Sequence, residues 1–251
     1  MHRLLVETEL LDGDAPILPK DAARHLKVLR PKDGEEIELF DGEGRFRVFK
    51  VQGSRFKDES LIPASETFNL QPSTFNLTLF ACVTKGSRWD WTIEKATELG
   101  VTRIVPVISE RTIVRIPKSE RAAKRERWLR IAEDAARQSD AKWLPEIREA
   151  LDFRDVLPLV KDTTCFIGAL TNPPPRPLAA AVAEKVKVEG EGEQRNWAVF
   201  IGPEGDFTPE ELEALMEIAT PTSFGPTILR AETAAIYAVS VLVSFINGKA
   251  N

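Results

Sequence analysis

The sequence predicts a two-part α/β protein, in which a small β-barrel precedes a domain built on a mostly parallel sheet. In the first seventy residues, polar and apolar residues alternate over several short segments, which is typical of half-buried strands in a small barrel. After that the period changes, and buried apolar runs alternate with helical segments, as in an α/β fold. The predicted domains are residues 1–70 and 74–251, with the boundary in the polar, proline-containing segment 69–73.

The N-terminal segment contains one clear hairpin. Residues 36–40 and 45–51 alternate in polarity, and residues 41–44 between them, with two glycines and an aspartate, have the chemistry of a turn. Before the hairpin, residues 25–30 are predicted to form a short helical turn that Pro31 ends.

The C-terminal segment alternates strands and helices. We expect strands at 75–83, 101–108, 163–170, 197–201 and 222–224, and helices at 87–99, 119–138, 178–187 and 232–247. Ser87 and Asp90 are spaced as a capping pair for the first of these helices, and Gly100 follows its end. Thr208 is expected to cap a further helix, with Glu211 at the third helical position.

The composition narrows the class of protein. No apolar run is long enough to span a bilayer, the N-terminus lacks the features of a secretory signal, and Cys82 and Cys165 lie inside apolar runs. These features predict a cytoplasmic protein with buried, reduced thiols and no membrane partner. Two cysteines and two histidines are too few and too scattered for a structural zinc site. Because His2 and His25 lie far from the motifs described below, neither a metal ion nor a catalytic histidine is expected.

The charge is unevenly distributed along the chain. A net charge of −5 argues against indiscriminate coating of nucleic acid, but it allows a local basic patch. Residues 111–130 contain eight basic and two acidic side chains. This segment is either an RNA-contacting surface or a solvated helix face, and the sequence leaves both open. The apolar segment 234–246 is likewise either a buried core helix or part of a subunit interface.

Two segments place glycine, proline and charged residues together after a predicted strand, where ligands bind in α/β folds. For residues 201–208 the alternative is an ordinary strand-to-helix turn. Residues 224–235 place Arg230, Glu232 and Thr233 before an apolar helix, and the alternatives are an internal Arg230–Glu232 salt bridge or a helix cap by Thr233. Neither segment has the glycine pattern of a dinucleotide fold or of a P-loop.

Together, Gly202-Pro203-Glu204-Gly205 and Leu229-Arg230-Ala231-Glu232-Thr233-Ala234 resemble the paired signature of the SPOUT methyltransferases. The resemblance is strongest to the RsmE family of 16S ribosomal RNA uridine-N3 methyltransferases. It runs nearly end to end, through short matches that follow the family's order. These matches lie at residues 2–4, 25–30, 40–42, 94–101, 109–111 and 138–139.

The chain also departs from the family's pattern. Where the family usually has Glu-Ala-x-x-Gln-Ser-Gly-Arg, residues 134–141 begin with Asp134 and end with Asp140-Ala141. The arginine that Ala141 replaces is expected to contact RNA or the active site, and Lys142 is the candidate substitute. In addition, Asp206 stands where a third glycine is common, and Thr227 replaces a frequent arginine. These departures are expected to affect substrate affinity rather than the paired signature.

The resemblance implies an N-terminal PUA-like β-barrel that helps to hold RNA, and a C-terminal domain with a deep trefoil knot. It also implies a homodimer that binds S-adenosylmethionine in the knotted loops, needs no metal ion and acts on 16S ribosomal RNA of the small ribosomal subunit. Cofactor contacts are expected, mainly from backbone groups, at Leu170, Ile201, Gly202, Pro203, Glu204, Gly205, Phe224, Gly225, Ile228 and Leu229. RNA contacts are expected at Lys27, Arg30, Arg111, Arg115, Arg121 and Lys124.

The implied reaction methylates uridine N3, which must lose its proton. Arg230 is assigned to orienting the base or stabilising negative charge on its carbonyl oxygens. Glu232 is the first candidate to accept the proton, with Thr233 assisting through a hydrogen bond, and Glu204 is the alternative base. Two other functions remain open: another SPOUT enzyme acting on transfer RNA or a ribose 2′-hydroxyl, and a non-enzymatic ribosome-assembly factor.

Overall fold

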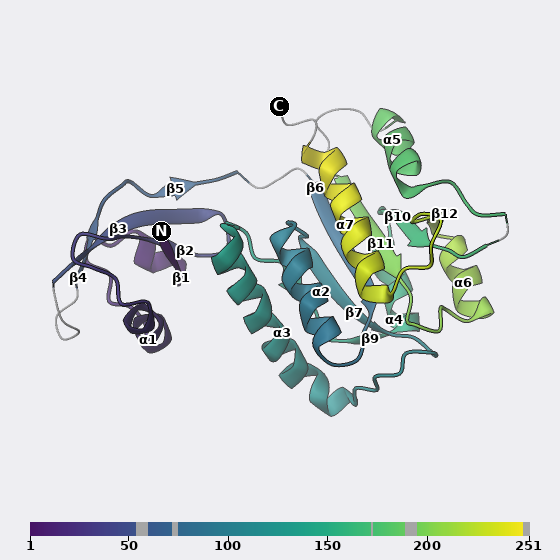
Figure 1. Cartoon of the computed structure of the whole chain (residues 1–251), viewed down its shortest axis with the longest axis horizontal. Helices are drawn as coiled ribbons and strands as arrows, with labels where there is room; N and C mark the ends of the chain where they lie inside the picture. Colours follow the sequence, from purple (N-terminus) through teal and green to yellow (C-terminus); the bar gives the residue numbers. More distant parts are fainter. Residues whose placement is uncertain (54–59, 72–74, 172, 189–194, 248–251) are drawn as a thin grey trace. The chain divides into compact units, whose positions relative to one another are not determined.

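The computed structural model describes residues 1–53, 60–71, 75–171, 173–188 and 195–247, which form two compact units (Figure 1). The small unit comprises Met1–Pro72 and Glu133–Leu144, and the large unit comprises Ser73–Ala132 and Pro145–Asn251. Contacts therefore assign residues 133–144 to the small unit, although the predicted domain of residues 74–251 contains them. The predicted boundary falls partly on residues 72–74, which lie outside the described residues.

The small unit is built on one sheet. Its elements are β1 (His2–Leu5), a 3-10 turn (Thr8–Leu11), α1 (Lys20–Leu29), β2 (Glu36–Phe40), β3 (Arg45–Gln52), β4 (Ser60–Pro63) and β5 (Phe68–Asn69). The strand order is β1-β2-β3-β4, and β5 also pairs with β3. β1 and β2 are parallel, whereas β2 and β3 form the predicted antiparallel hairpin. The hairpin prediction is confirmed.

Two expectations for the small unit are corrected. Among its described residues, β1 and β4 end the strand path and do not pair with each other, so the sheet is open rather than a closed barrel. Each of these strands has only four residues, which leaves little edge to close a barrel. Helix α1 is also longer than the predicted turn at residues 25–30. It ends at Leu29, and its C-cap residue Arg30, which has a φ of 50°, stands immediately before Pro31.

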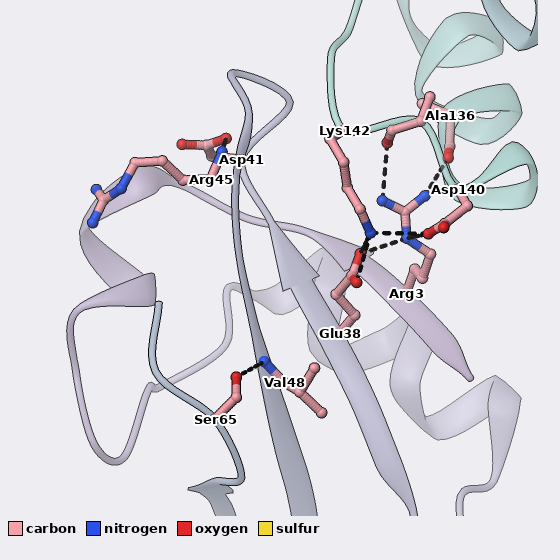
Figure 2. A network of polar contacts seen from close by, with 10 residues as sticks. Arg3, Glu38, Asp41, Arg45, Val48, Ser65, Ala136, Asp140 and Lys142 are labelled. Atoms are coloured by element: carbon pink, nitrogen blue, oxygen red, sulfur yellow. Dashed lines mark hydrogen bonds and ion pairs between the residues drawn. The ribbon is translucent and has the colours of Figure 1, made fainter. Parts of the chain in front are cut away.

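A buried ion-pair network ties residues 136–142 to the sheet of the small unit (Figure 2). The Arg3 guanidinium donates to Glu38 Oε1 at 2.7 Å and to the carbonyl oxygens of Ala136 and Ala141 at 2.6 and 2.9 Å. Lys142 Nζ donates to both oxygens of Glu38 at 2.6 Å. Lys142, the candidate substitute for the missing arginine, is therefore engaged inside the small unit.

The large unit is built on a sheet in which every strand pairing is parallel, as predicted. Its strands are β6 (Phe75–Cys82), β7 (Arg103–Ile108), β8 (Glu146–Ile147), β9 (Leu151–Asp152), β10 (Thr164–Gly168), β11 (Arg195–Ile201) and β12 (Ala219–Thr222). Their order is β12-β10-β11-β6-β7-β8, and β9 also pairs with β7. The last three strands of the chain lie together in the sheet, with β10 between β11 and β12.

Helices cover both faces of this sheet. The helical elements from residue 87 onward are α2 (Ser87–Glu98), α3 (Lys118–Ser139), α4 (Phe153–Val156), a 3-10 turn (Leu157–Val160), α5 (Leu178–Val188), α6 (Pro209–Met216) and α7 (Ala231–Asn247). Side chains of α2, α5, α7 and the first part of α3 share one apolar core, and side chains of α4 and α6 share another on the opposite face. Figure 1 shows α7 running beside α2, and the two helices are in contact. In the described part of the chain, no helix is long and apolar enough to cross a membrane.

The caps were predicted with mixed success. Thr208 and Glu211 form the predicted capping box of α6, in which each side chain accepts from the other residue's backbone N–H. By contrast, Gly86 occupies the N-cap of α2 and makes no side-chain cap. The expected Ser87–Asp90 capping pair is therefore wrong, because the Asp90 carboxylate is paired with Arg127 instead. The short elements between residues 146 and 160 were not predicted.

Candidate active site

A cavity of about 280 Å³ lies at the carboxyl ends of β10, β11 and β12. The adjacent segments 168–170, 200–206 and 222–231 contribute nearly all of its lining. The two motif segments of the sequence therefore meet at one cavity. The predicted cofactor residues that line it are Leu170, Ile201, Gly202, Pro203, Glu204, Phe224, Gly225, Ile228 and Leu229. Gly205 is not among the described residues that line it.

Two glycines shape the wall that Phe224 forms. A Cβ at Gly168 would lie 2.5 Å from the Phe224 ring, so only glycine allows the ring to pack against the end of β10. Gly225, which follows the ring, has a φ of 124°, a backbone conformation that side chains with a Cβ rarely adopt. The sequence identified Gly225 but missed Gly168, since nothing near it in sequence marks the approach of Phe224.

The second wall is the loop after β11, whose conformation depends on Asp206. Asp206 has a φ of 60°, and its backbone N–H donates to the Pro203 carbonyl oxygen at 2.9 Å. Its carboxylate accepts from the backbone N–H of Phe207 at 2.8 Å. Aspartate is one of the few residues that tolerate the left-handed region, because its short polar side chain bonds locally. The replacement of the family's glycine by Asp206 is therefore compatible with the turn.

This loop is braced from outside by residues 109–111. Arg111 Nη1 donates to the carbonyl oxygens of Gly205 and Phe207 at 3.0 and 3.2 Å. The buried Glu211 carboxylate accepts from the backbone N–H groups of Glu110, at 2.8 Å, and Thr208, at 3.1 Å. Arg111 was predicted to contact RNA, but in the structure its guanidinium bonds to the loop after β11.

Two carboxylates share one guanidinium beside the cavity. Arg88 Nη1 lies 3.4 Å from Glu204 Oε1, and Arg88 Nε lies 3.7 Å from Glu232 Oε1. The Glu232 side chain is only 12% exposed, and its Oε2 is buried without a hydrogen-bond partner among the described residues. Buried oxygens without partners are rare in proteins, which marks Glu232 as available to a ligand or substrate. Arg88 was missed, because its segment carries no motif of its own.

The other predicted catalytic residues lie on the surface. Arg230 lines the cavity, and its exposed side chain makes no hydrogen bond or ion pair within the described chain. The alternative of an Arg230–Glu232 salt bridge is therefore not observed, since Glu232 faces Arg88. Thr233 is exposed on the first turn of α7 and is not among the described lining residues.

The remaining predicted RNA-binding residues divide into two groups. Arg115 donates to the carbonyl oxygens of Ser109 and Glu110, and Arg121 is buried against Asp152 at 2.5 Å. These two arginines stabilise the turn before α3 and its first part. Lys124 in the large unit, and Lys27 and Arg30 in the small unit, are exposed, so their ammonium and guanidinium groups are accessible.

The parallel sheet, and the glycine-shaped cavity at its carboxyl edge, place the large unit in the class of ligand-binding α/β domains. A family model described as the RNA methyltransferase domain matches residues 71–243, and one described as the RNA methyltransferase PUA domain matches residues 18–58. The first match covers more than half of the chain. The protein belongs to this family of RNA methyltransferases.

Relatives and solved structures agree with this assignment. Ribosomal RNA small subunit methyltransferase E of Bacillus subtilis is 28% identical over 247 residues, which cover 96% of each chain. The structure of the Neisseria gonorrhoeae enzyme of the same name, bound to S-adenosylmethionine, is 28% identical, covers 98% of each chain and has a TM-score of 0.80. A Legionella pneumophila methyltransferase in complex with the same cofactor is 28% identical, covers 97% of each chain and has a TM-score of 0.77. The resemblance to the RsmE family is confirmed.

Proposed function

We propose that this protein transfers a methyl group from S-adenosylmethionine to N3 of a uridine in the 16S ribosomal RNA of the small ribosomal subunit. The observation that carries the proposal is the meeting of the two signature segments at one cavity, with Glu232 beside it. Two similar structures hold S-adenosylmethionine, and similar proteins are named ribosomal RNA small subunit methyltransferase E.

The residues of the cavity fit this cofactor. Glycine and apolar side chains dominate the lining, which suits an adenine ring and the contacts of backbone groups. Three carboxylates, those of Glu204, Asp206 and Glu232, lie at or beside the cavity, against the two guanidinium groups of Arg88 and Arg230. The excess negative charge favours a cationic sulfonium, and the partnerless Oε2 of Glu232 leaves an acceptor free. Leu170, Ile201, Gly202, Phe224 and Leu229 would hold the cofactor.

When bound, the cofactor supplies a methyl group that is already activated, so the protein mainly has to hold the reactants in line. Glu232 accepts the N3 proton of the uracil, directly or through a water molecule. Arg230, with no partner within the described residues, stabilises the negative charge that spreads onto the uracil carbonyl oxygens. Thr233 assists by hydrogen bonding, and Glu204 is the alternative base.

The proposal includes the finer architecture that the family implies. The large unit is a SPOUT domain with a trefoil knot, within residues 74–251, and residues 1–70 form a PUA-like domain that holds RNA. Two subunits form a homodimer, and the protein acts in the cytoplasm without a metal ion. Lys27, Arg30 and Lys124, all exposed, belong to the RNA surface.

The test of the activity is mass analysis of nucleosides after incubation of small-subunit RNA with the protein and labelled S-adenosylmethionine. The expected product is 3-methyluridine. A methylated ribose, or a product formed only in transfer RNA, would assign the protein to another SPOUT activity. Failure to bind S-adenosylmethionine by calorimetry, with no methylated nucleoside, would favour a non-enzymatic assembly factor.

The test of the residue roles is single-turnover kinetics with saturating cofactor. Glu232→Gln is expected to slow methyl transfer by about a hundredfold or more, because it removes the proton acceptor. Arg230→Ala is expected to slow it by a comparable factor, because charge stabilisation is lost. Arg154→Ala and Glu149→Gln, at exposed positions of the large unit, are the matched controls. Unchanged rates for both site variants would discard the assignment.

A further inference from the structure

A second cavity, of about 400 Å³, lies within the small unit. Its lining comes from β1, α1, the C-terminal end of α3 and the flanking residues Met1 and Asp140. It is predominantly polar and brings together both histidines of the sequence. The lining residues that the argument uses are His2, Arg3, His25, Arg137, Gln138 and Asp140.

Two of these side chains have unused hydrogen-bonding groups. Across the residues that the structure describes, the His25 imidazole and the Gln138 amide make no hydrogen bond or ion pair. The other polar lining groups are engaged: His2 lies 3.5 Å from Glu35, and Arg137 is paired with Asp134. An imidazole and an amide together offer both donors and acceptors to a ligand in the cavity.

Two lining residues of this cavity, Arg3 and Asp140, belong to the polar network of Figure 2. Arg3 is only 7% exposed, and its guanidinium donates to the carbonyl oxygens of Ala136 and Ala141, on either side of Gln138 and Asp140. Lys142 Nζ donates a hydrogen bond to Asp140 Oδ1 at 2.9 Å. A ligand therefore meets a backbone that is already ordered, which lowers the entropy cost of binding.

We propose that this cavity binds one nucleotide of the substrate RNA, and this inference rests on the proposed function. Single-stranded RNA presents unstacked bases that stack on rings such as imidazole and bond to amides along their edges. The chemistry of His25 and Gln138 matches these two contacts. The volume of the cavity lies within the range of about 300–1,000 Å³ that is typical of ligand pockets. The nucleotide bound here is held by the small unit and is distinct from the methylated uridine.

The experiment measures binding of transcribed 16S ribosomal RNA by filter binding, with excess transfer RNA as competitor and without cofactor. His25→Ala and Gln138→Ala are each expected to raise the Kd about fivefold, and the double variant more than either, because each removes one hydrogen bond or stacking contact. Gln52→Ala, at the exposed glutamine of β3 in the same unit, is the matched control and is expected to leave the Kd unchanged.

The affinity for S-adenosylmethionine and the melting temperature are measured on the same variants, and both are expected to stay at wild-type values. A wild-type Kd for RNA in the double variant would overturn the inference even if the wild-type protein methylates RNA. A wild-type protein that binds no cofactor would instead refute the proposed function, while the RNA measurement would still decide the inference. Because Gln138 is exposed, Gln138→Ala alone keeps the test decisive if His25→Ala fails to fold.

Discussion

Replacing Arg111 by alanine separates two accounts of this residue. The sequence assigns Arg111 to RNA binding, whereas the structure shows its guanidinium donating to the carbonyl oxygens of Gly205 and Phe207 in the loop after β11. If the guanidinium braces the loop, Arg111→Ala weakens the binding of S-adenosylmethionine. If it contacts RNA instead, the variant weakens RNA binding and leaves cofactor affinity unchanged.

The magnitude follows from the two hydrogen bonds. A hydrogen bond from a charged donor contributes up to about 1.5–3 kcal/mol, and this value must be reduced here because the Arg111 side chain is exposed. We therefore take about 1–2 kcal/mol for the pair. If the whole loss appears in binding, the Kd for S-adenosylmethionine rises roughly five- to thirtyfold. Arg111→Lys keeps one donor at a single point and is expected to recover part of the affinity.

The assay is calorimetric titration with S-adenosylmethionine, accompanied by the melting temperature of each variant. Arg154→Ala, at an exposed arginine of α4, is the control and is expected to bind as the wild type does. Wild-type cofactor affinity in a folded Arg111→Ala variant would refute the reasoning. A parallel loss of RNA affinity in that variant would return Arg111 to the RNA surface.

Three further results are expected. Burial raises the pKa of Cys82 to about 11, so its thiol should resist alkylation at pH 8 in the native protein. An exposed thiol in the unfolded chain ionises near pH 9, so the free energy of unfolding, measured by chemical denaturation, should fall as the pH rises from about 9 to about 11. Arg3→Ala should lower the free energy of unfolding in urea by about 3 kcal/mol, because it leaves the buried Glu38 carboxylate without this partner. Arg24→Ala, at an exposed position, should change it by less than about 0.5 kcal/mol, and equal effects of the two variants would contradict the role of burial. Gly44→Ala should lower the free energy of unfolding more than Gly34→Ala in the same assay. Both glycines have a positive φ, but only at Gly44 would an added Cβ clash with a ring, that of Trp143, at 2.3 Å.

The architecture of the large unit could be predicted because its strands and helices are long and strongly patterned. β6 is mostly apolar and β11 ends in the apolar run of residues 197–201, and the Thr208 cap marks the start of α6. The elements between residues 146 and 160 escaped prediction because β8 and β9 have two residues each and α4 has four, too few to show a period. The open sheet of the small unit depends on which strand edges pair, and a polarity pattern carries no such information.

The cavity could be predicted in outline, because both signature segments follow strands whose carboxyl ends lie at one edge of the sheet. The partners of its charged side chains could not be. Arg88 is distant in sequence from Glu204 and Glu232, and only the folded chain brings its guanidinium between them. The same holds for Gly168, whose role depends on a ring far along the chain.

Charge counting along residues 111–130 overestimated the accessible positive charge. Arg111, Arg115 and Arg121 bind backbone carbonyl oxygens or a carboxylate, and Arg127 is paired with Asp90. An arginine near the end of a strand or helix finds carbonyl oxygens that need donors, and its fork of N–H groups satisfies several at once. A basic segment that flanks such ends is therefore a poor measure of an RNA surface. Exposed lysines such as Lys124 are better candidates.

The departures from the family's pattern show where a glycine can be replaced. Asp140 and Asp206 both stand where the family commonly has glycine, and both have a φ of 60°. The left-handed region disfavours most side chains but tolerates aspartate, whose carboxylate can bond locally. Asp206 accepts from the next backbone N–H, and Asp140 pairs with Lys142, which also lowers the pKa of its carboxyl. Aspartate therefore supports the left-handed backbone of both turns, and each substitution adds a negative charge beside a cavity.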